Sequence, residues 1–214
     1  MKIILLLGAG LSSSSLIRYL LDHAEQEDWF VNVVDQDLAL VQRKIGKHPR
    51  AAALSFNALD PAERKPMIGH ADLVISMLPA RFHAEVAVDC IELKTHLITP
   101  SYVSPEMKAL AEQAVKAGIV IMNEIGVDPG IDHMSAMQII HEIQAKGGKM
   151  DSFKSFCGGL MAPGSDDNPW HFKFTWNPRN VVLAGQGGAA AFIQNNENKY
   201  IPYAQLFKRT ERFE

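Results

Sequence analysis

The segment IILLLGAGLSS at residues 3–13 decides the fold, because a run of aliphatic residues leads directly into a glycine turn. An uninterrupted apolar run that ends at a glycine, here Gly8, is typical of a central parallel strand covered on both faces. Beyond the turn, apolar residues recur at helical spacing at Leu16, Ile17 and Leu20. The segment therefore predicts a strand, a tight turn and a helix, in that order.

Short apolar runs and helical patterns alternate through the first part of the chain. After the first strand, further strands are expected at residues 30–34, 51–54, 73–78, 96–99 and 119–122. Helices are expected at residues 37–47, 82–93 and 105–118, the last with Ser104 as its N-cap and Gly118 as its stop. This alternation predicts an α/β fold with a Rossmann-type doubly wound parallel sheet.

The pattern changes beyond residue 126, which places the expected domain boundary between residues 1–125 and residues 126–214. The second part is expected to be α+β and incomplete. It predicts a helix at residues 131–146, strands at 152–156 and 172–176, a loop at 162–169, a helix from 177 to Gly185, and a hairpin formed by residues 191–194 and 199–203 around Asn-Asn-Glu-Asn.

The composition is that of an ordinary globular protein, with 214 residues, 47% hydrophobic residues and a formal net charge of −3. This charge favours neither a nucleic acid nor a membrane surface as a partner, and no apolar run approaches the roughly 20 residues of a membrane span. Two cysteines, Cys90 and Cys157, favour a reducing, cytoplasmic compartment over a disulfide framework. A signal peptide is the alternative interpretation of residues 1–7, but the apolar run is only five residues long, which favours a buried strand.

Several other kinds of site find no support in the sequence. The eight histidines are scattered, and no Cys or His pair has the spacing of a zinc site, so no metal is expected. The glycine turn lacks the Gly-Lys-Ser/Thr of a P-loop, and the chain has no G-x-S-x-G elbow of a hydrolase.

The glycine turn follows the pattern of a dinucleotide-binding fingerprint, because it ends a strand and opens a helix. Gly8 would permit the tight turn, and Gly10 would let the backbone approach a pyrophosphate. Ser13 stands where the fingerprint has its third glycine, and serine is small enough for the packing required there. The helix start, at Leu11 and Ser12, offers N–H donors to phosphates, and both serine hydroxyls are further candidate donors. The alternative is a glycine turn of some other strand–helix unit.

Asp35 closes the second expected strand, where an acid accepts hydrogen bonds from the adenosine ribose. The same charge repels a 2′-phosphate, so Asp35 favours NAD over NADP, with NADP left open. The alternative role of Asp35 is to cap the next helix, although Asp37 is also placed for that.

Several segments together resemble the saccharopine dehydrogenase family, in its glutamate-forming or reductase branch. The resemblance runs in order through the whole chain, and its most specific part is the Asp-Pro-Gly-Ile-Asp-His run at residues 128–133. The segments that carry it are MLPARFHA at 77–84, TPSYVSP at 99–105, NEIGVDPGIDH at 123–133, SFCGGLMAP at 155–163, and FKFTW at 172–176 with Arg179.

This resemblance implies an oxidoreductase with an NAD(P)-binding Rossmann domain at residues 1–125 and part of a substrate-binding domain at residues 126–214. The substrate is expected in the cleft between them. The reaction implied is hydride transfer between the nicotinamide cofactor and the secondary amine or imine of saccharopine, in either direction. The sequence departs from the family in two ways: reductase members commonly favour NADPH, and members are longer, so the chain is expected to be a truncated piece.

The candidate site residues follow strands whose carboxyl ends face one crevice of an open α/β sheet. Ser76, Leu78 and Pro79 are expected beside the cofactor. The resemblance implies that Ser101 contacts both cofactor and substrate, and that the substrate pocket also contains Tyr102, Asp128, Gly130, Cys157, Gly158 and Gly159. The candidates for proton transfer are Tyr102, Asp128, Cys157 and His133.

Each of these assignments has a structural alternative. Asp128 and Asp132 could serve the start of the helix at residue 131 as a cap and as a charge on its dipole. His133 could be a packed or surface histidine, Cys157 a small buried apolar residue, and Tyr102 an interface tyrosine.

The function also has alternatives. One is a related dehydrogenase acting on lysine or a carboxylated polyamine, and another is a module that binds a dinucleotide without turnover. A small amino-acid substrate is expected, and a homodimer is left open.

Overall fold

The computed structural model describes residues 1–159, 161–184 and 188–209 of the chain. The chain divides into two compact units, Met1–Gly158 and Gly159–Glu214. This division differs from the expected domain boundary between residues 125 and 126. The expected boundary separates a nucleotide-binding part from a substrate-binding part, and it stays a prediction.

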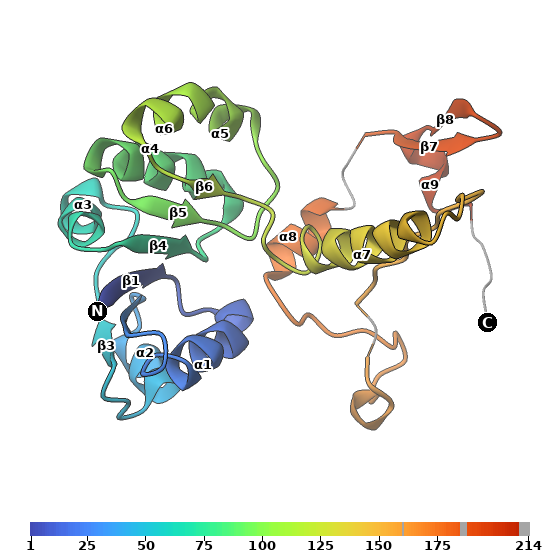
Figure 1. Ribbon diagram of the computed structural model, residues 1–214. Coiled ribbons are helices and arrows are strands. Elements are labelled where there is room, and N and C mark those ends of the chain that lie inside the picture. Colours follow the sequence, from blue (N-terminus) through green and yellow to red (C-terminus); the bar gives the residue numbers. More distant parts are fainter. Residues whose placement is uncertain (160, 185–187, 210–214) are drawn as a thin grey trace. The chain divides into compact units, whose positions relative to one another are not determined.

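The first unit is built on a six-stranded parallel sheet with the order β3-β2-β1-β4-β5-β6 (Figure 1). This is the strand order of a doubly wound Rossmann sheet, which confirms the predicted fold class. Because β1 pairs with both β2 and β4, the strand order reverses at β1, and ligands of such sheets bind outside the carboxyl ends at this point. The strands are β1 (Lys2–Leu7), β2 (Trp29–Val34), β3 (Ala51–Leu54), β4 (Leu73–Ser76), β5 (His96–Ile98) and β6 (Ile121–Met122).

Helices follow the strands of the first unit, and side-chain caps begin α2, α3 and α5. Asp37 accepts a hydrogen bond from Leu40 N at 2.9 Å, and Ser104 accepts one from Met107 N at 3.1 Å. The helices are η1 (Leu11–Ser13), α1 (Ser14–Asp22), α2 (Leu38–Ile45), α3 (Pro61–Gly69), η2 (Ala80–Phe82), α4 (His83–Leu93), α5 (Pro105–Ala109), α6 (Ala111–Ala117) and α7 (Ile131–Ala145).

The helices differ from the expectation in two places. The helix expected at residues 105–118 is divided at Leu110 into α5 and α6. The α3 helix was not expected, yet it has a clear start signal: Asp60 caps it by accepting from Ala62 N at 2.9 Å, and Pro61 is its first residue.

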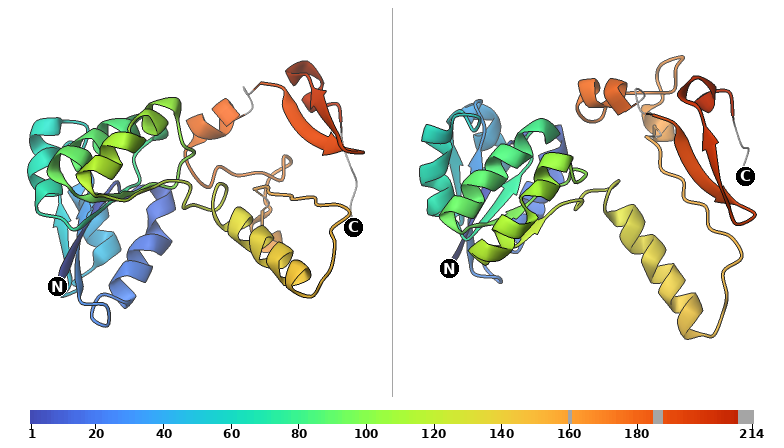
Figure 2. Two further views of the ribbon diagram at one scale, coloured as in Figure 1. Left: turned by 45° about the horizontal axis from the view of Figure 1, so that its top comes forward. Right: turned by 90° about the horizontal axis from the view of Figure 1, so that it is seen from above.

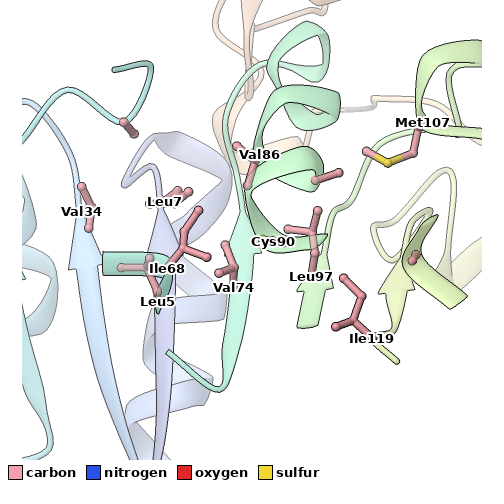
Figure 3. Packing of buried hydrophobic residues seen from close by; sticks show 13 residues of the cluster. Leu5, Leu7, Val34, Ile68, Val74, Val86, Cys90, Leu97, Met107 and Ile119 are labelled. Carbon is pink, nitrogen blue, oxygen red and sulfur yellow. The ribbon is translucent and has the colours of Figure 1, made fainter. Parts of the chain in front are cut away.

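The core lies on both faces of the sheet, because successive residues of a strand point to opposite faces. Leu5 and Leu7 of β1 belong to one cluster, which α3, α4, α5 and α6 cover (Figure 3). Ile4 and Leu6 belong to the other, which α1 and α2 cover (Figure 2). The continuous apolar run at residues 3–7 is therefore explained by burial on both sides.

The second unit contains η3 (Pro163–Ser165), α8 (Pro178–Ala184), β7 (Ala190–Gln194), β8 (Glu197–Ile201) and α9 (Tyr203–Leu206). The expected hairpin is confirmed, since β7 and β8 pair in antiparallel fashion. Its turn residues Asn195 and Asn196 both have positive φ, 54° and 60°, as a two-residue type I′ turn requires. The expected helix after residue 177 is α8, and Gly185, its expected end, lies outside the described residues.

The strands expected at residues 152–156 and 172–176 are wrong, because both segments are irregular. An alternating apolar pattern makes a strand only where a neighbouring strand pairs with its backbone, and no described strand pairs with either segment. The aromatic side chains of Phe172, Phe174 and Trp176 instead remain 39–51% exposed.

The described part of the chain holds neither a membrane-spanning helix nor a metal-binding cluster. No helix there is long and apolar enough to cross a membrane. Within those same residues, no group of three His, Cys, Asp or Glu side chains is placed to hold a metal ion.

Candidate functional site

The glycine turn joins the carboxyl end of β1 to η1 and passes close to the end of β4. Gly8 has a φ of +103°, and a Cβ there would lie 3.1 Å from the Met77 carbonyl oxygen. Its N–H donates to Val34 O at 2.8 Å, which ties the turn to β2 as well. A side chain at Gly8 is therefore excluded by both conformation and space.

The start of η1 forms a small group of backbone donors. Among the described residues, no acceptor is within hydrogen-bond reach of the N–H groups of Leu11 and Ser12, as expected for the first turn of a helix. No described atom other than chain neighbours lies within 4 Å of the Cβ position at Gly10. The turn thus presents accessible backbone and free N–H donors, which is the arrangement that fits a pyrophosphate.

Ser13 occupies the third fingerprint position and is buried, with 1% of its surface exposed. Its hydroxyl donates to Gly10 O at 2.9 Å. Serine thus fits the close helix–sheet packing, but its hydroxyl hydrogen is already engaged within the turn. The hydroxyl of Ser12 has no hydrogen-bond partner among the described residues.

Asp35 follows β2 and holds the glycine turn. Its Oδ2 accepts from Ala9 N at 2.8 Å, and its Oδ1 accepts from Asp37 N at 3.2 Å. The cap of α2 is Asp37, so the capping alternative for Asp35 is wrong. A carboxylate has about four lone-pair positions, so Asp35 keeps acceptor capacity for the hydroxyls of a ribose.

Lys44, on α2, also reaches the glycine turn, and the sequence analysis did not single it out. Its Nζ donates to Gly10 O at 2.5 Å and to Ser13 Oγ at 3.3 Å. Burial lowers the pKa of Lys44, while the negative charge of Asp35 acts in the opposite direction. A positive charge therefore lies beside the turn expected to bind phosphate. Only the packing of α2 beside α1 reveals this, because nothing in the local sequence marks Lys44.

The residues after β4 lie on the same edge of the sheet. Ser76 is fully buried at the end of β4, and Leu78 is half-buried against the core cluster on that face. Pro79 is the N-cap of η2, and its carbonyl accepts from Phe82 N at 2.9 Å. His83, another residue that sequence reasoning missed as a site residue, connects Ser76 to Ser101 through hydrogen bonds of 2.9 Å on each side.

The loops after β5 and β6 are joined by backbone hydrogen bonds. Glu124 N donates to Ser101 O at 3.0 Å, and Ile125 N donates to Thr99 O at 3.2 Å. These bonds bring Tyr102 to Asp128, and the phenol donates to Asp128 Oδ1 at 2.7 Å. The hydrogen bond to Asp128 is the main cause that raises the pKa of Tyr102 to about 12, so the phenol keeps its proton at neutral pH.

The start of α7 is held by Asp132 rather than by Asp128. Asp132 Oδ1 accepts from Gly130 N at 2.9 Å, and His133 Nδ1 lies 2.7 Å from the same oxygen. The capping alternative for Asp128 is therefore wrong. The hydrogen bond to Asp132 raises the pKa of His133, which is exposed and engaged with Asp132.

Gly130 has a packing role in addition to its predicted place in the substrate pocket. Its φ is +149°, and a Cβ there would collide with the carbonyl of Gly126. Gly126 N also donates to Pro129 O at 2.9 Å. The glycine thus permits the tight loop that carries Asp128.

Cys157 is exposed, contrary to its alternative as a buried apolar residue. A hydrogen bond to Asp128 is the main cause that raises the pKa of the Cys157 thiol. Asp128 thus accepts from Tyr102 and raises the pKa of Cys157, and the proton-transfer roles of these residues stay a prediction. Gly158 ends the first unit and Gly159 begins the second, and both are exposed.

A doubly wound sheet, a glycine turn with free N–H groups and an acid at the end of β2 define the dinucleotide-binding Rossmann class. Two family models then match the chain: "Saccharopine dehydrogenase NADP binding domain" at residues 4–122 and "Saccharopine dehydrogenase C-terminal domain" at residues 126–214. The chain belongs to the saccharopine dehydrogenase family.

Relatives and a solved structure agree with this assignment. Saccharopine dehydrogenase [NADP(+), L-glutamate-forming] of Saccharomyces cerevisiae is 42% identical over 88% of this chain and 41% of that protein. Alpha-aminoadipic semialdehyde synthase of Arabidopsis thaliana is 39% identical over 90% of this chain and 18% of that protein. The structure of apo saccharopine dehydrogenase (L-Glu forming) from Saccharomyces cerevisiae matches with a TM-score of 0.85 and 36% identity, covering 100% of this chain and 47% of that one. The chain thus spans less than half the length of these relatives.

Proposed function

We propose that this chain forms the nicotinamide-nucleotide site, and part of the substrate site, of an oxidoreductase that interconverts the secondary amine and the imine of saccharopine. The observation that carries the proposal is the Tyr102–Asp128 hydrogen bond of 2.7 Å. It joins the loops that follow β5 and β6, on the sheet edge where the glycine turn and Asp35 also lie. The names of the relatives support the substrate.

The chain's own groups divide into those that hold the nucleotide and those that handle protons. Leu11 and Ser12 N–H groups bind the pyrophosphate, and Asp35 accepts from the adenosine ribose. The nicotinamide, when bound, supplies the hydride acceptor or donor. The other groups proposed to contact the nucleotide are Gly8, Gly10, Ser13, Ser76, Leu78, Pro79 and Ser101.

Proton transfer is assigned to the cluster around Asp128. The amine must lose a proton when its C–H bond is oxidised, and Asp128 is the acceptor that the cluster offers. Tyr102, which keeps its proton with a pKa of about 12, donates a hydrogen bond to Asp128 and orients it. Asp128 also raises the pKa of the Cys157 thiol, which is the third group assigned to proton transfer. The substrate pocket is proposed to include Ser101, Tyr102, Asp128, Gly130, Cys157, Gly158 and Gly159.

NAD is the proposed cofactor, because Asp35 places a negative charge where a 2′-phosphate would lie. The residues that follow it, Gln36 and Asp37, carry no positive charge. NADP is the second candidate, supported by the matching NADP-binding family model and by the NADP(+) in the names of the fungal relatives. Lys44, which lies beside Gly10, is a positively charged residue that would favour the binding of NADP.

Fluorescence titrations with NADH and NADPH, on this chain and on the full-length protein, test the proposal. NADH is expected to bind at least about tenfold more tightly, a difference of ~1.4 kcal/mol. Tighter binding of NADPH would make NADP the proposed cofactor in place of NAD. If the full-length protein bound neither nucleotide, the proposed nucleotide site would be overturned.

Turnover by the full-length protein tests the substrate. NADH oxidation with 2-aminoadipate semialdehyde and glutamate is expected, and a panel with lysine and carboxylated polyamines separates the related dehydrogenases. Tight nucleotide binding without turnover on any of these amines would instead indicate a non-enzymatic module.

A further inference from the structure

A buried imidazole crosses the carboxyl edge of β4 and β5. His83, the first residue of α4, is 3% exposed and lies between two serine hydroxyls. Its Nδ1 is 2.9 Å from Ser76 Oγ, and its Nε2 is 2.9 Å from Ser101 Oγ. Ser76 ends β4 and is fully buried, whereas Ser101 follows β5 and is half-buried beside Tyr102.

The imidazole is neutral over the physiological range, because burial lowers the pKa of His83 to about 4. A neutral imidazole carries one hydrogen, so one ring nitrogen donates and the other accepts. The ring therefore accepts a hydrogen bond from one serine and donates one to the other. Once the direction of one of these hydrogen bonds is known, the direction of the other follows.

The direction is set at Ser76. The hydroxyl of Ser76 is fully buried, and among the described residues its hydrogen-bond partner is Nδ1 of His83. A buried hydroxyl hydrogen without an acceptor is unfavourable, so Ser76 donates to Nδ1. The ring hydrogen then lies on Nε2, which donates to Ser101 Oγ. The hydroxyl hydrogen of Ser101 is left free to donate elsewhere.

We propose that Ser76 and His83 are positioning residues that hold Ser101 as a hydrogen-bond donor to a carbonyl or carboxylate oxygen of a bound ligand. The oxygen belongs either to the nicotinamide carboxamide or to a carboxylate of the amino-acid substrate. This role rests on the proposed function. The opposite ring tautomer would use the Ser101 hydrogen internally and would turn Ser101 toward the ligand as an acceptor.

The ring tautomer is tested directly by ¹⁵N NMR of the histidine side chains in the full-length protein. The signal of His83 is identified by its loss in His83→Gln. A neutral ring with its hydrogen on Nε2 is expected at neutral pH, and a hydrogen on Nδ1 would overturn the proposal. This measurement does not depend on cofactor binding, so it is independent of the proposed function.

A double-mutant cycle tests the effect on ligands. Ser76→Ala removes the donor to Nδ1, lets both tautomers form and is expected to weaken ligand binding about three- to tenfold. In the Ser101→Ala background the same substitution is expected to have no further effect. Thr95→Val is the matched control, because Thr95 is 3% exposed and its hydroxyl donates to Ile68 O at 3.1 Å, away from this edge.

The two sources of the oxygen are separated by the readout. A weaker Kd for the nucleotide indicates the carboxamide, whereas a raised KM for the amino acid with an unchanged nucleotide Kd indicates the carboxylate. His83→Gln, whose amide can still donate to Ser101, is expected to retain more binding than His83→Leu. The proposal would be overturned if Ser76→Ala had the same effect in the wild-type and Ser101→Ala backgrounds. It would also be overturned if Ser76→Ala had no larger effect than Thr95→Val. A wild-type protein that binds neither nucleotide would overturn the proposed function, and the ligand role of Ser101 with it.

Discussion

The phenol of Tyr102 donates a 2.7 Å hydrogen bond to Oδ1 of Asp128, although the two residues are 26 positions apart along the chain. Their meeting depends on backbone, since Glu124 N donates to Ser101 O and Ile125 N donates to Thr99 O in the flanking loops. The tyrosine remains 63% exposed, so the pair is open to solvent and to a small molecule.

The first prediction concerns the titration of Tyr102. Asp128→Asn is expected to lower its pKa from about 12 toward the ordinary tyrosine value of about 10, because the carboxylate disfavours the phenolate. Since the folded pKa is the higher one, the stabilisation from this pair is complete below about pH 10 and is lost as the pH rises toward 12. The ultraviolet absorbance of phenolate measures the titration, and Tyr102→Phe identifies its signal. An unchanged titration in Asp128→Asn would contradict the contact.

The second prediction concerns cofactor choice. Asp35→Asn keeps an acceptor for Ala9 N–H but removes the charge, so it is expected to improve NADPH binding relative to NADH by about tenfold, or ~1.4 kcal/mol. Asp37→Asn is the matched control, because it removes a neighbouring charge and asparagine caps a helix as well as aspartate does. Nucleotide titrations measure both variants, and equal changes would show that general charge, rather than Asp35, discriminates.

The third prediction concerns the two thiols. Cys157 is exposed and is expected to react with iodoacetamide in the folded protein. Asp128→Asn is expected to speed that reaction at a given pH, because Asp128 raises the thiol pKa. Cys90 is buried with a pKa raised to about 12, so it is expected to react only after unfolding. Mass spectrometry of the labelled peptides gives both rates, with Cys157→Ser as the control. A Cys157 rate that is insensitive to Asp128→Asn would count against the cluster.

The fourth prediction concerns a buried ion pair in the core of the first unit. Arg64 and Asp89 are 1% and 4% exposed, with Nη2 2.6 Å from Oδ2. Asp89→Ala leaves the guanidinium buried without its partner and is expected to lower the free energy of unfolding by ~3–5 kcal/mol. Lys65→Met is the control, because Lys65 approaches the same carboxylate from the solvent side at 3.7 Å, where ion pairs contribute little. Urea unfolding followed by circular dichroism compares the two, and a similar loss in both would contradict the prediction.

Much of the fold could be predicted because its signals lie in neighbouring residues. The apolar run at residues 3–7 indicated a strand covered on both faces, and the structure places it at the centre of the sheet. Ser104-Pro105 marked a helix start, and the asparagine-rich segment after residue 194 marked the hairpin turn. The same signal, an N-cap residue followed by proline, occurs at Asp60-Pro61 and predicts α3 equally well.

The predictions that were wrong or stayed open concern features that neighbouring residues determine only in part. Phe172, Phe174 and Trp176 alternate as in a strand, but a strand also needs hydrogen-bond partners from another part of the chain. The roles of Asp35 and Asp37 were likewise left open by the sequence. Only their contacts showed that Asp37 caps α2 and that Asp35 holds the glycine turn.

The sequence by itself determined the succession of the six strands along the first unit, the glycine turn and the family. Each of these is expressed in periodicity, turn chemistry or contiguous motifs. Tertiary structure alone decided that Tyr102 contacts Asp128, that Lys44 reaches Gly10, and that His83 connects Ser76 to Ser101. The physical reason is that these contacts join residues far apart in the chain, so they depend on strand order and loop geometry.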